Sequence, residues 1–436
     1  MKRLVLVAAA IAAASPAAAA PTETVIHSFT GAGGGDTPYG GLIADKNGVL
    51  YGTTSGTRSN EPNAMGTVFS LTFMGGKKGW VLQGLYHFLG SDQLDGAHPC
   101  CALTMDPSGA LYGATPQGGG HEDAGTIFKL TPPAAGSTDW TETVLFQGAV
   151  DGNITAFHIN APLIRDAAGA LFGTAAYGGN AAACPSGCGV AFKLIPPAAG
   201  QTTWKYTTLY NFQGGNDGID PTGGLLRDAT GALYGATALG GNGTLCGGTQ
   251  GCGTIFKLTP PAKGQTAWTE GVLYAFTGGN DGANANGGLV RARSGAFYGT
   301  TVHGGGGASD GGVIFKLSPP AAGQTMWTEA ALYPFQAPPD SDDPYGGVTL
   351  GPGGVLFGTA SAAGAEYSGT VFKLIPPAAG RTSWAEEVLY NFQGFEGGTD
   401  GEYPYGNLLR DAAGNLYGTT SRGGASGYGT VFEVTP

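Results

Sequence analysis

The sequence predicts an all-β fold, a seven-bladed β-propeller with four antiparallel strands in each blade. Three observations predict it: one segment recurs seven times, three others recur in phase with it, and the chain ends carry complementary parts of one repeat. Glycine makes up 82 of 436 residues and charged residues only 12%, which is typical of many tight turns or of disorder. A hydrophobic content of 42% with 20 Phe and 18 Tyr favours a folded core.

The first 19 residues are predicted to be a signal peptide. Lys2 and Arg3 precede an apolar run at 4–14 that is too short to span a bilayer, and small residues lead up to Ala19. This order is typical of a secretory signal that is cleaved there, and a retained membrane anchor is the alternative. We expect residues 20–436 to form one monomeric domain in the periplasm or outside the cell, with no membrane span.

The repeat is most easily followed through a segment that reads LYGTT at its first occurrence, 50–54. Its central glycines lie 59 to 64 residues apart, at Gly52, Gly113, Gly173, Gly235, Gly299, Gly358 and Gly418. A regular period of this length is typical of propellers and other repeat architectures.

Four segments in each repeat have strand character, because they alternate apolar and polar residues or are rich in Val, Ile, Thr, Tyr and Phe. They are G-G-L-x-x-D, as at 40–45, the LYGTT segment, a GTVF-like segment, as at 66–69, and W-x-E-x-V-L-Y-x-F, as at 384–392. Beyond the signal, no segment has apolar residues at helical spacing, so we expect no helix.

The connections within a repeat are typical of tight hairpins. D-x-x-G joins the first two strands, as in Asp45 to Gly48, where Asp opens a type I turn and Gly adopts positive φ. P-P-A-A-G-x-T joins the last two, as at 132–138, and its prolines end a strand because they lack an N–H. Repeats five and six have Ala292 and Gly351 in place of the Asp.

The two ends of the chain predict a closed ring. The last GTVF copy, at 429–432, has no Trp-containing strand after it, whereas residues 23–29 read ETVIHSF and match EVLYNF at 387–392. We therefore expect residues 23–29 to supply the outer strand of the seventh blade. An open solenoid would not need its first strand to complete its last repeat, and closure hides exposed strand edges.

The motif set resembles the GloVer tandem-repeat family, whose repeat contains G-L-x-x-D and L-Y-G-T-T, over about residues 23–436. The resemblance is specific because the motifs recur seven times. It implies a propeller-like fold in an exported bacterial protein, often with a C-terminal surface anchor. This chain stops at Pro436 without such an anchor, and the resemblance implies no activity.

The loops that join successive blades are expected to share one face with the variable loops between strands two and three, and function usually lies on such loops. They contain no Lys or Arg, and their carboxylates are Asp36, Asp92, Asp95, Asp151, Asp217, Asp220, Asp281, Asp340, Asp342, Asp343, Glu396, Asp400 and Glu402. The resulting negative potential attracts cations and disfavours nucleic acid. Bound Ca²⁺ and ordinary Asp-Gly turn formation are the two interpretations, and nothing in the sequence requires a cofactor.

One position just before the first strand recurs in every blade and is expected to ring the mouth of the central channel. Its residues are Tyr39, Cys100, Asn160, Thr222, Asn286, Tyr345 and Tyr405. Tyrosines beside carboxylates suit sugars, because rings stack on C–H surfaces and acids accept hydroxyl hydrogen bonds; simple packing is the alternative. The predicted ligand-binding residues are Tyr39, Asn160, Asn286, Tyr345, Tyr405, Asp95, Asp151, Asp217, Asp281 and Asp400.

Histidines and cysteines provide two further candidates. His98 and His158 occupy equivalent places in neighbouring blades and His121 lies on a nearby loop, so three imidazoles could hold a transition metal; drift among repeats is the alternative. Cysteine spacing in an exported protein predicts three local disulfides, Cys100–Cys101, Cys184–Cys188 and Cys246–Cys252. Two free, buried thiols are the alternative for the adjacent pair.

No nucleophile elbow or zinc-protease motif is present, so no catalytic residue is assigned. We expect a non-catalytic binding or interaction protein whose partner is a glycan or another exported protein. A carbohydrate-active hydrolase or lyase that uses loop carboxylates is one alternative, and a structural or adhesion protein is another.

Overall fold

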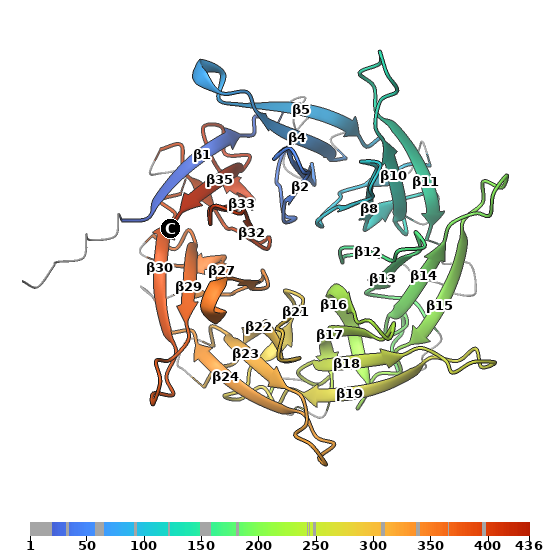
Figure 1. Cartoon of the computed structure of the whole chain (residues 1–436), viewed down its shortest axis with the longest axis vertical. Helices are drawn as coiled ribbons and strands as arrows, with labels where there is room; N and C mark the ends of the chain where they lie inside the picture. The colour runs from blue at the N-terminus through green and yellow to red at the C-terminus, as the bar shows by residue number, and fades with distance from the viewer. Residues whose placement is uncertain are drawn as a thin grey trace, which may run out of the picture.

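The chain is an all-β ring of seven antiparallel sheets around a central opening (Figure 1), which confirms the predicted seven-bladed propeller. The structure, a computed structural model, describes residues 20–31, 35–56, 65–90, 94–120, 123–148, 158–179, 183–241, 243, 245–246, 250–306, 310–336, 341–364, 366–394 and 398–436. The predicted signal peptide lies outside these residues. No helix in the described part of the chain is both long and apolar enough to cross a membrane.

The blades follow one another along the chain, and each begins at the channel and ends at the rim. Blade 1 consists of β2 (Ile43–Ala44), β3 (Leu50–Thr54), β4 (Thr67–Phe73) and β5 (Trp80–His87). Blade 2 consists of β7 (Thr104–Met105), β8 (Leu111–Thr115), β10 (Thr126–Thr131) and β11 (Thr141–Gln147). Blade 3 consists of β12 (Ile164–Arg165), β13 (Leu171–Ala175), β14 (Val190–Ile195) and β15 (Lys205–Asn211). Blade 4 consists of β16 (Gly218–Arg227), β17 (Leu233–Gly240), β18 (Thr254–Thr259) and β19 (Thr269–Ala275).

The remaining blades keep the same order, and small accessory elements extend some of them. Blade 5 consists of β20 (Ala283–Ala285) with β21 (Val290–Arg291), then β22 (Phe297–His303), β23 (Val313–Ser318) and β24 (Thr328–Pro334). Blade 6 consists of β26 (Thr349–Leu350), β27 (Leu356–Ala360), β29 (Thr370–Ile375) and β30 (Ala385–Asn391). Blade 7 consists of β32 (Leu409–Arg410), β33 (Leu416–Thr420), β35 (Thr430–Thr435) and β1 (Thr22–Ser28). The accessory elements are β6 (Gly96–Ala97) with β9 (Gln117–Gly118), β25 (Ser341–Asp342) with β28 (Ala362–Ala363), β31 (Gly401–Glu402) with β34 (Arg422–Gly423), and the 3₁₀ turns η1 (Gly76–Lys78) and η3 (Pro352–Gly354).

The N-terminal strand closes the ring, as the sequence predicts. Strand β1 pairs antiparallel with β35, with Thr22 opposite Thr435 and Ser28 opposite Thr430, and the two strands lie side by side in Figure 1. A β-bulge between Val25 and His27 shifts the register within the pair. The first described strand therefore completes the last blade, so residues 22–28 and 430–435 lie in one sheet.

The recurring glycine of the LYGTT segment has a packing role. It lies opposite the Phe of the GTVF-like segment, as Gly113 does opposite Phe128. A Cβ atom at Gly113 would come within 2.4 Å of the Phe128 ring, so only glycine leaves room for that buried ring. Phe88, at the end of the fourth strand of the preceding blade, packs edge-on against Phe128 with ring centroids 5.0 Å apart. Such pairs contribute about 0.5–1.5 kcal/mol beyond burial and join successive blades.

A second contact between blades uses three polar residues, which we call the Tyr–Asp–Glu trio. A Tyr on the fourth strand donates a hydrogen bond to an Asp in the loop that follows it, and a Glu on the outer strand of the next blade faces that Asp. Among the described residues, such trios are Tyr86–Asp95–Glu142, Tyr210–Asp217–Glu270, Tyr274–Asp281–Glu329 and Tyr390–Asp400–Glu23, with Tyr-to-Asp oxygen distances of 2.8–2.9 Å.

Blades 2 and 3 meet without such a trio, and an aromatic pair takes its place. Tyr206 occupies the position of the Glu, opposite Leu194 on the neighbouring strand, and its ring stacks on Phe146 at a centroid distance of 4.5 Å. The same position on the outer strand thus makes a polar contact in the trios and an apolar contact between blades 2 and 3. In these contacts a Glu occupies the position where the Tyr and Asp partners are present, which indicates that the Glu has a structural role.

The glutamates of the trios are set to bind protons near neutral pH. Burial first, and the nearby Asp second, raise the pKa of Glu142, Glu270 and Glu329 to about 7 and that of Glu23 to about 8. Because these pKa values exceed the ordinary Glu value of about 4.3, the folded chain binds more protons than the unfolded chain between pH ~4.3 and pH 7–8. The contribution to stability is therefore complete below pH ~4.3 and is lost as the pH rises through 7–8.

We expect Glu270→Gln to reduce the pH dependence of stability, because a neutral amide imitates the protonated acid. The free energy of unfolding, measured by urea denaturation from pH 5 to 9, should fall with pH more steeply in the wild type than in the variant. Glu387→Gln is the control, since Glu387 is half exposed and pairs with Lys373. Identical pH profiles for the wild type and Glu270→Gln would contradict the assignment.

Candidate functional site

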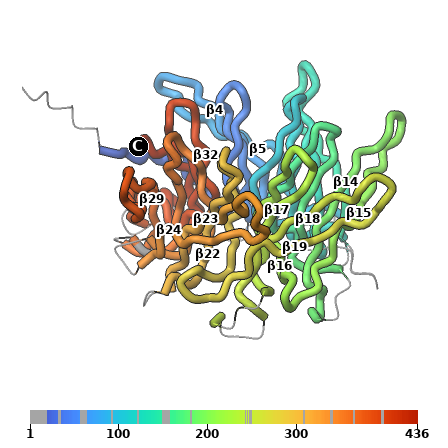
Figure 2. Tube along the Cα trace, turned by 60° about the horizontal axis from the view of Figure 1, so that its bottom comes forward, coloured from blue at the N-terminus to red at the C-terminus, as the bar shows by residue number. Residues whose placement is uncertain are grey.

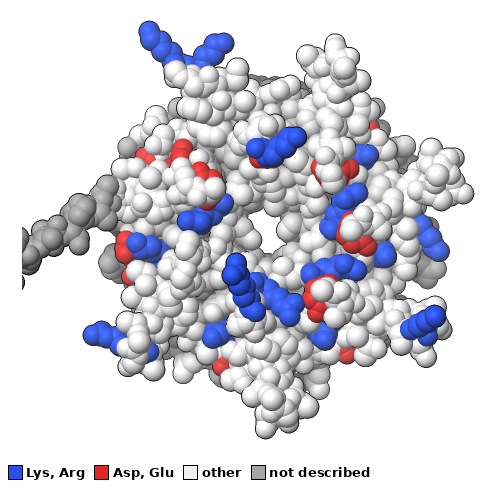
Figure 3. Space-filling view, in the orientation of Figure 1, with Lys and Arg blue, Asp and Glu red and all other residues white. Residues whose placement is uncertain are grey.

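The seven residues predicted to ring the channel mouth all line one cavity of about 760 Å³. The cavity occupies the central opening, which is visible from one side in Figure 3. Each of these residues lies just before the innermost strand of its blade, except Thr222, which lies within β16, so the seven blades contribute equivalent positions to a single site. Its volume lies in the range of small-molecule pockets.

Glycine pairs let the innermost segments approach one another at this mouth. A Cβ atom at Gly287 would lie 2.3 Å from the backbone nitrogen of Gly347, and one at Gly347 would lie 2.2 Å from the oxygen of Gly287. Any side chain at either position would therefore push two blades apart. Threonines of the LYGTT segment tie the same segments together, as when Thr419 donates a hydrogen bond to the Gly40 carbonyl at 3.0 Å.

Three tyrosines from consecutive blades form a continuous aromatic arc on one side of the mouth. Tyr405 lies between Tyr39 and Tyr345, with ring centroids 5.2 and 5.3 Å away. Tyr39 and Tyr345 each expose 37% of their surface, whereas Tyr405 is half-buried. Burial first, and the two neighbouring tyrosines second, raise the pKa of Tyr405 to about 12, so its hydroxyl stays neutral and can donate a hydrogen bond.

Polar groups from the other blades complete the ring. The side-chain amides of Asn160 and Asn286 form no hydrogen bond within the described part of the chain, so both remain available to a ligand. Thr222 is already engaged, because its hydroxyl donates to the Ala285 carbonyl at 3.1 Å. Asp220 also lines the cavity, and burial raises the pKa of its carboxyl to about 6.

The predicted histidine site coincides with a backbone feature that the sequence analysis missed. The residue two places before each ring position has positive φ, and these residues are Thr37, His98, His158, Asp220, Asn284, Asp343 and Tyr403. Asn, Asp and His are the side chains most often found in that conformation, so their enrichment at one offset was the available signal. His98 and His158 therefore hold a turn in their blades.

Neither histidine has a metal-binding neighbourhood. The Nδ1 atom of His98 lies 2.7 Å from the Ser55 carbonyl, and His158 packs edge-on against Tyr177 at a centroid distance of 5.4 Å. His121 lies outside the described residues. Across the described ranges, no group of three or more His, Cys, Asp or Glu side chains is arranged to hold a metal ion.

The predicted acidic ligands lie away from the cavity. Asp95, Asp217, Asp281 and Asp400 belong to the Tyr–Asp–Glu trios, and none of them lines the channel cavity. Each also accepts a backbone N–H within its own loop, as Asp281 does from Thr277 at 2.8 Å. Each interblade loop thus folds around its own Asp carboxylate, and the carboxylate faces the Glu on the outer strand of the next blade. Asp151 lies outside the described residues.

The cysteines divide into two bonded pairs and one open pair. Disulfides join Cys184 to Cys188 and Cys246 to Cys252, at the spacings from which they were predicted. Cys100 and Cys101 are free thiols with their sulfur atoms 2.8 Å apart, and both line the channel cavity. The hydrogen bond with Cys100, and then burial, raises the pKa of the Cys101 thiol. Their predicted disulfide stays a prediction.

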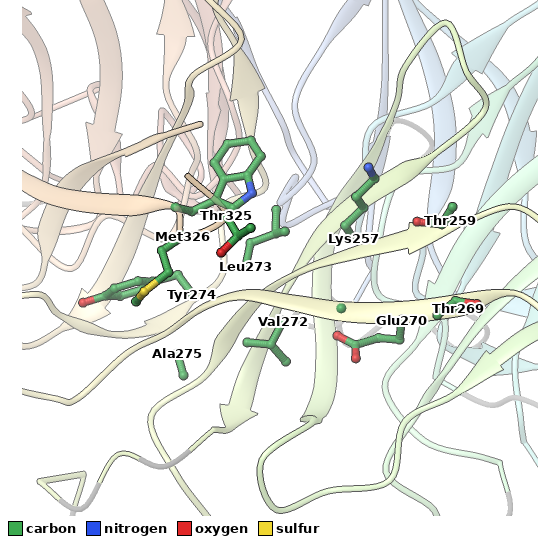
Figure 4. A pocket seen from close by; sticks show the side chains of 12 residues that line it. Lys257, Thr259, Thr269, Glu270, Val272, Leu273, Tyr274, Ala275, Thr325 and Met326 are labelled. Carbon is green, nitrogen blue, oxygen red and sulfur yellow. The ribbon is translucent and has the colours of Figure 1, made fainter. Parts of the chain in front are cut away.

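A second hollow lies on the rim where blades 4 and 5 meet. It has a volume of about 510 Å³, and Glu270, Tyr274 and Met326 are among the residues that line it. Figure 4 shows Glu270 on β19 and Met326 on the segment that leads into β24. Because the acid of this groove belongs to a trio, the groove is a weaker candidate than the sevenfold channel mouth.

Comparisons with known proteins agree with the fold. A family model described as the Gloeobacter/Verrucomicrobia repeat matches residues 15–246 and 242–436. No curated protein sequence matches the chain.

Among solved structures, the extracellular domain of a putative hybrid two-component system from B. thetaiotaomicron aligns with a TM-score of 0.52 at 13% identity, covering 96% of this chain. The chain spans 42% of the length of that structure. The periplasmic gluconolactonase of Pseudomonas aeruginosa aligns with a TM-score of 0.45 at 14% identity, covering 80% of this chain and 84% of its own. A glucose dehydrogenase aligns with a TM-score of 0.43 at 15% identity, covering 95% of this chain and 99% of its own. At these identities the likeness concerns the fold alone.

We expect Asp281→Ala to destabilise the protein by about 1–3 kcal/mol, because buried donors lose their acceptor. Asp281 accepts hydrogen bonds from the Tyr274 hydroxyl and from both the backbone and the hydroxyl of Thr277. Urea denaturation measures the change, and Asp139→Ala on an exposed hairpin is the control. Unaltered stability together with lost ligand binding would instead identify Asp281 as a ligand residue.

Proposed function

The chain belongs to the Gloeobacter/Verrucomicrobia repeat family, and from that membership and the geometry of the channel mouth we propose that it is an exported, non-catalytic protein that binds carbohydrate. The observation that carries the proposal is the arc of Tyr39, Tyr405 and Tyr345 beside unpaired amides in one cavity. Two local disulfides favour the periplasm or the cell exterior, since such bonds persist in oxidising compartments.

The chemistry of the two sides of the mouth suits a sugar. A pyranose ring has C–H faces, which pack on the exposed rings of Tyr39 and Tyr345, and equatorial hydroxyls, which need donors and acceptors at its edge. Asn160 from blade 3 and Asn286 from blade 5 line the same cavity and supply both. The neutral hydroxyl of Tyr405 adds a donor between the two exposed rings.

Binding is favoured over hydrolysis by the count of acids in the cavity. Glycosidases of the usual kind use two carboxyl groups about 5–10 Å apart. Among the described residues that line the cavity, Asp220 is the one carboxylate. A hydrolase or lyase is therefore the second candidate, and it would need a further acid that enters the cavity. A purely structural or adhesive protein is the third, and it would leave the cavity without a ligand.

We expect Tyr405→Ala and Tyr39→Ala each to weaken oligosaccharide binding by about two- to tenfold, because each change removes an aromatic contact of the arc worth about 0.5–1.5 kcal/mol. A glycan array identifies ligands of the wild-type protein, and isothermal titration calorimetry then gives the affinities. Tyr367→Ala is the control, since Tyr367 is 66% exposed and does not line the cavity.

Two outcomes would contradict the proposal. A wild-type protein that binds no glycan would favour the structural alternative. Release of shorter sugars from an oligosaccharide panel, abolished by Asp220→Asn, would establish the enzyme.

A further inference from the structure

Four arginines, which we call the arginine collar, occupy one equivalent position in four blades. Each is the last residue of its innermost strand, and they are Arg165, Arg227, Arg291 and Arg410. The innermost strand runs from the tyrosine mouth to the D-x-x-G turn, so the collar surrounds the opposite mouth of the channel. Figure 3 views this face and shows Lys and Arg side chains gathered around the central opening.

Aromatic rings lie against three of the arginines, and most of these rings belong to the preceding blade. The guanidinium of Arg227 lies 5.7 Å from the centre of the Phe172 ring, and that of Arg410 lies 5.9 Å from the centre of the Phe357 ring. Arg291 lies 5.7 Å from the ring centres of both Tyr234 and Phe297. A stacked guanidinium keeps its planar edge free for hydrogen bonds, so it is pre-organised to receive a flat anion.

The guanidinium groups lack acceptors for part of their hydrogen-bonding capacity. The Nε atoms of Arg165 and Arg410 are buried and have no hydrogen-bond partner within the described part of the chain. A buried donor without a partner is costly, so these atoms indicate an acceptor that comes from a ligand or a solvent molecule. This observation is independent of the charge pattern.

Neighbouring carboxylates do not neutralise the collar. In the described residues, no carboxylate oxygen lies within 4.0 Å of any of these four guanidinium groups. Asp228, which follows Arg227, is occupied by its own turn, where it accepts from Thr230, Ala232 and Tyr234.

The fifth blade departs from the repeat in a way that strengthens the positive charge. Its turn has Ala292 in place of the usual Asp, and Arg293 follows, so Arg291 and Arg293 flank a neutral residue. Both arginines are exposed. The largest uncompensated charge of the collar therefore lies beside blade 5.

The channel cavity links the collar with the tyrosine arc. Ile164 and Leu226 line the cavity, and they immediately precede Arg165 and Arg227. The four arginines do not line the cavity themselves, so a ligand that stacks on the tyrosines must extend past Ile164 and Leu226 to reach the guanidinium groups.

We propose that the arginine collar binds the carboxylate or sulfate groups of an acidic glycan whose sugar rings occupy the channel. The proposal rests on the carbohydrate function proposed above and adds the class of sugar. Planar guanidinium groups pair with carboxylates and sulfates through two parallel hydrogen bonds. A nucleic acid fits less well, because the acidic loops at the other face repel densely spaced phosphates.

The test compares four probes by calorimetry: an oligogalacturonate, its fully methyl-esterified neutral form, a single-stranded DNA of equal charge, and inorganic sulfate. We expect the oligogalacturonate to bind at least about tenfold more tightly than the ester and the DNA, with an affinity that falls as salt rises. Equal binding of the acid and the ester would overturn the assignment and leave the carbohydrate function standing. DNA binding as tight as that of the oligogalacturonate would overturn both.

Matched variants come from the chain itself, because blades 2 and 6 carry Met105 and Leu350 at the collar position. Arg165→Met with Arg227→Leu should lower oligogalacturonate affinity by about tenfold or more and leave the ester unaffected. Arg381→Gln, on an exposed outer hairpin, is the control. An unchanged affinity of the double variant would refute the collar. If the collar variants lower oligogalacturonate affinity and Tyr405→Ala does not, the arginine collar would stand and the tyrosine site would be refuted.

Discussion

The antiparallel pairing of β1 with β35 is the contact on which the rest of the molecule depends. Each blade packs only on its two neighbours, so the first and last blades have a complete set of contacts only when the ring is closed. Phe29, which directly follows β1, then packs on Phe69 of blade 1 with centroids 5.2 Å apart. Without this strand, the outer edge of β35 would be unpaired and Phe69 would lose its contact with Phe29.

Closure also assembles the candidate site. Tyr405 comes from blade 7 and Tyr39 from blade 1, so the contact between their rings crosses the junction that β1 completes. The backbones of Gly406 and Gly41 approach so closely there that a Cβ atom on Gly406 would lie 2.8 Å from the Gly41 nitrogen. The aromatic arc is therefore a product of the closed ring and is not a property of any single repeat.

The repeat architecture was predictable from the sequence because its constraints are local and recur seven times. Glycine opposite a buried Phe, Asp in a type I turn, and the two halves of the last blade each leave a pattern of residue types. The residues at the channel mouth were predictable because they recur at one fixed position in the repeat, and Tyr39, Tyr345 and Tyr405 all line the predicted mouth.

The acids were harder to interpret, because a turn-forming Asp and a ligand Asp look alike in sequence. Asp217 and Asp281 each follow a Tyr by seven residues and accept a hydrogen bond from its hydroxyl. This offset in the sequence is the signal that distinguishes them from ligand residues. The arginines lie on the face whose turns are uniform, and their common position at the end of the innermost strand indicates a binding site only once the strands are known to surround a channel. The residue pattern within one blade can be recognised in the sequence, whereas contacts between blades can be identified only from the closed ring.

Hydrogen–deuterium exchange of the backbone amides in 22–28 tests the closed ring most directly. If β1 completes blade 7, these amides should exchange as slowly as those of the outer strands β11 and β19, and should lose protection only when the whole ring unfolds. Exchange at the rate of an unstructured peptide, while the other outer strands stay protected, would show an open ring and would remove the basis for a site shared by blades 7 and 1.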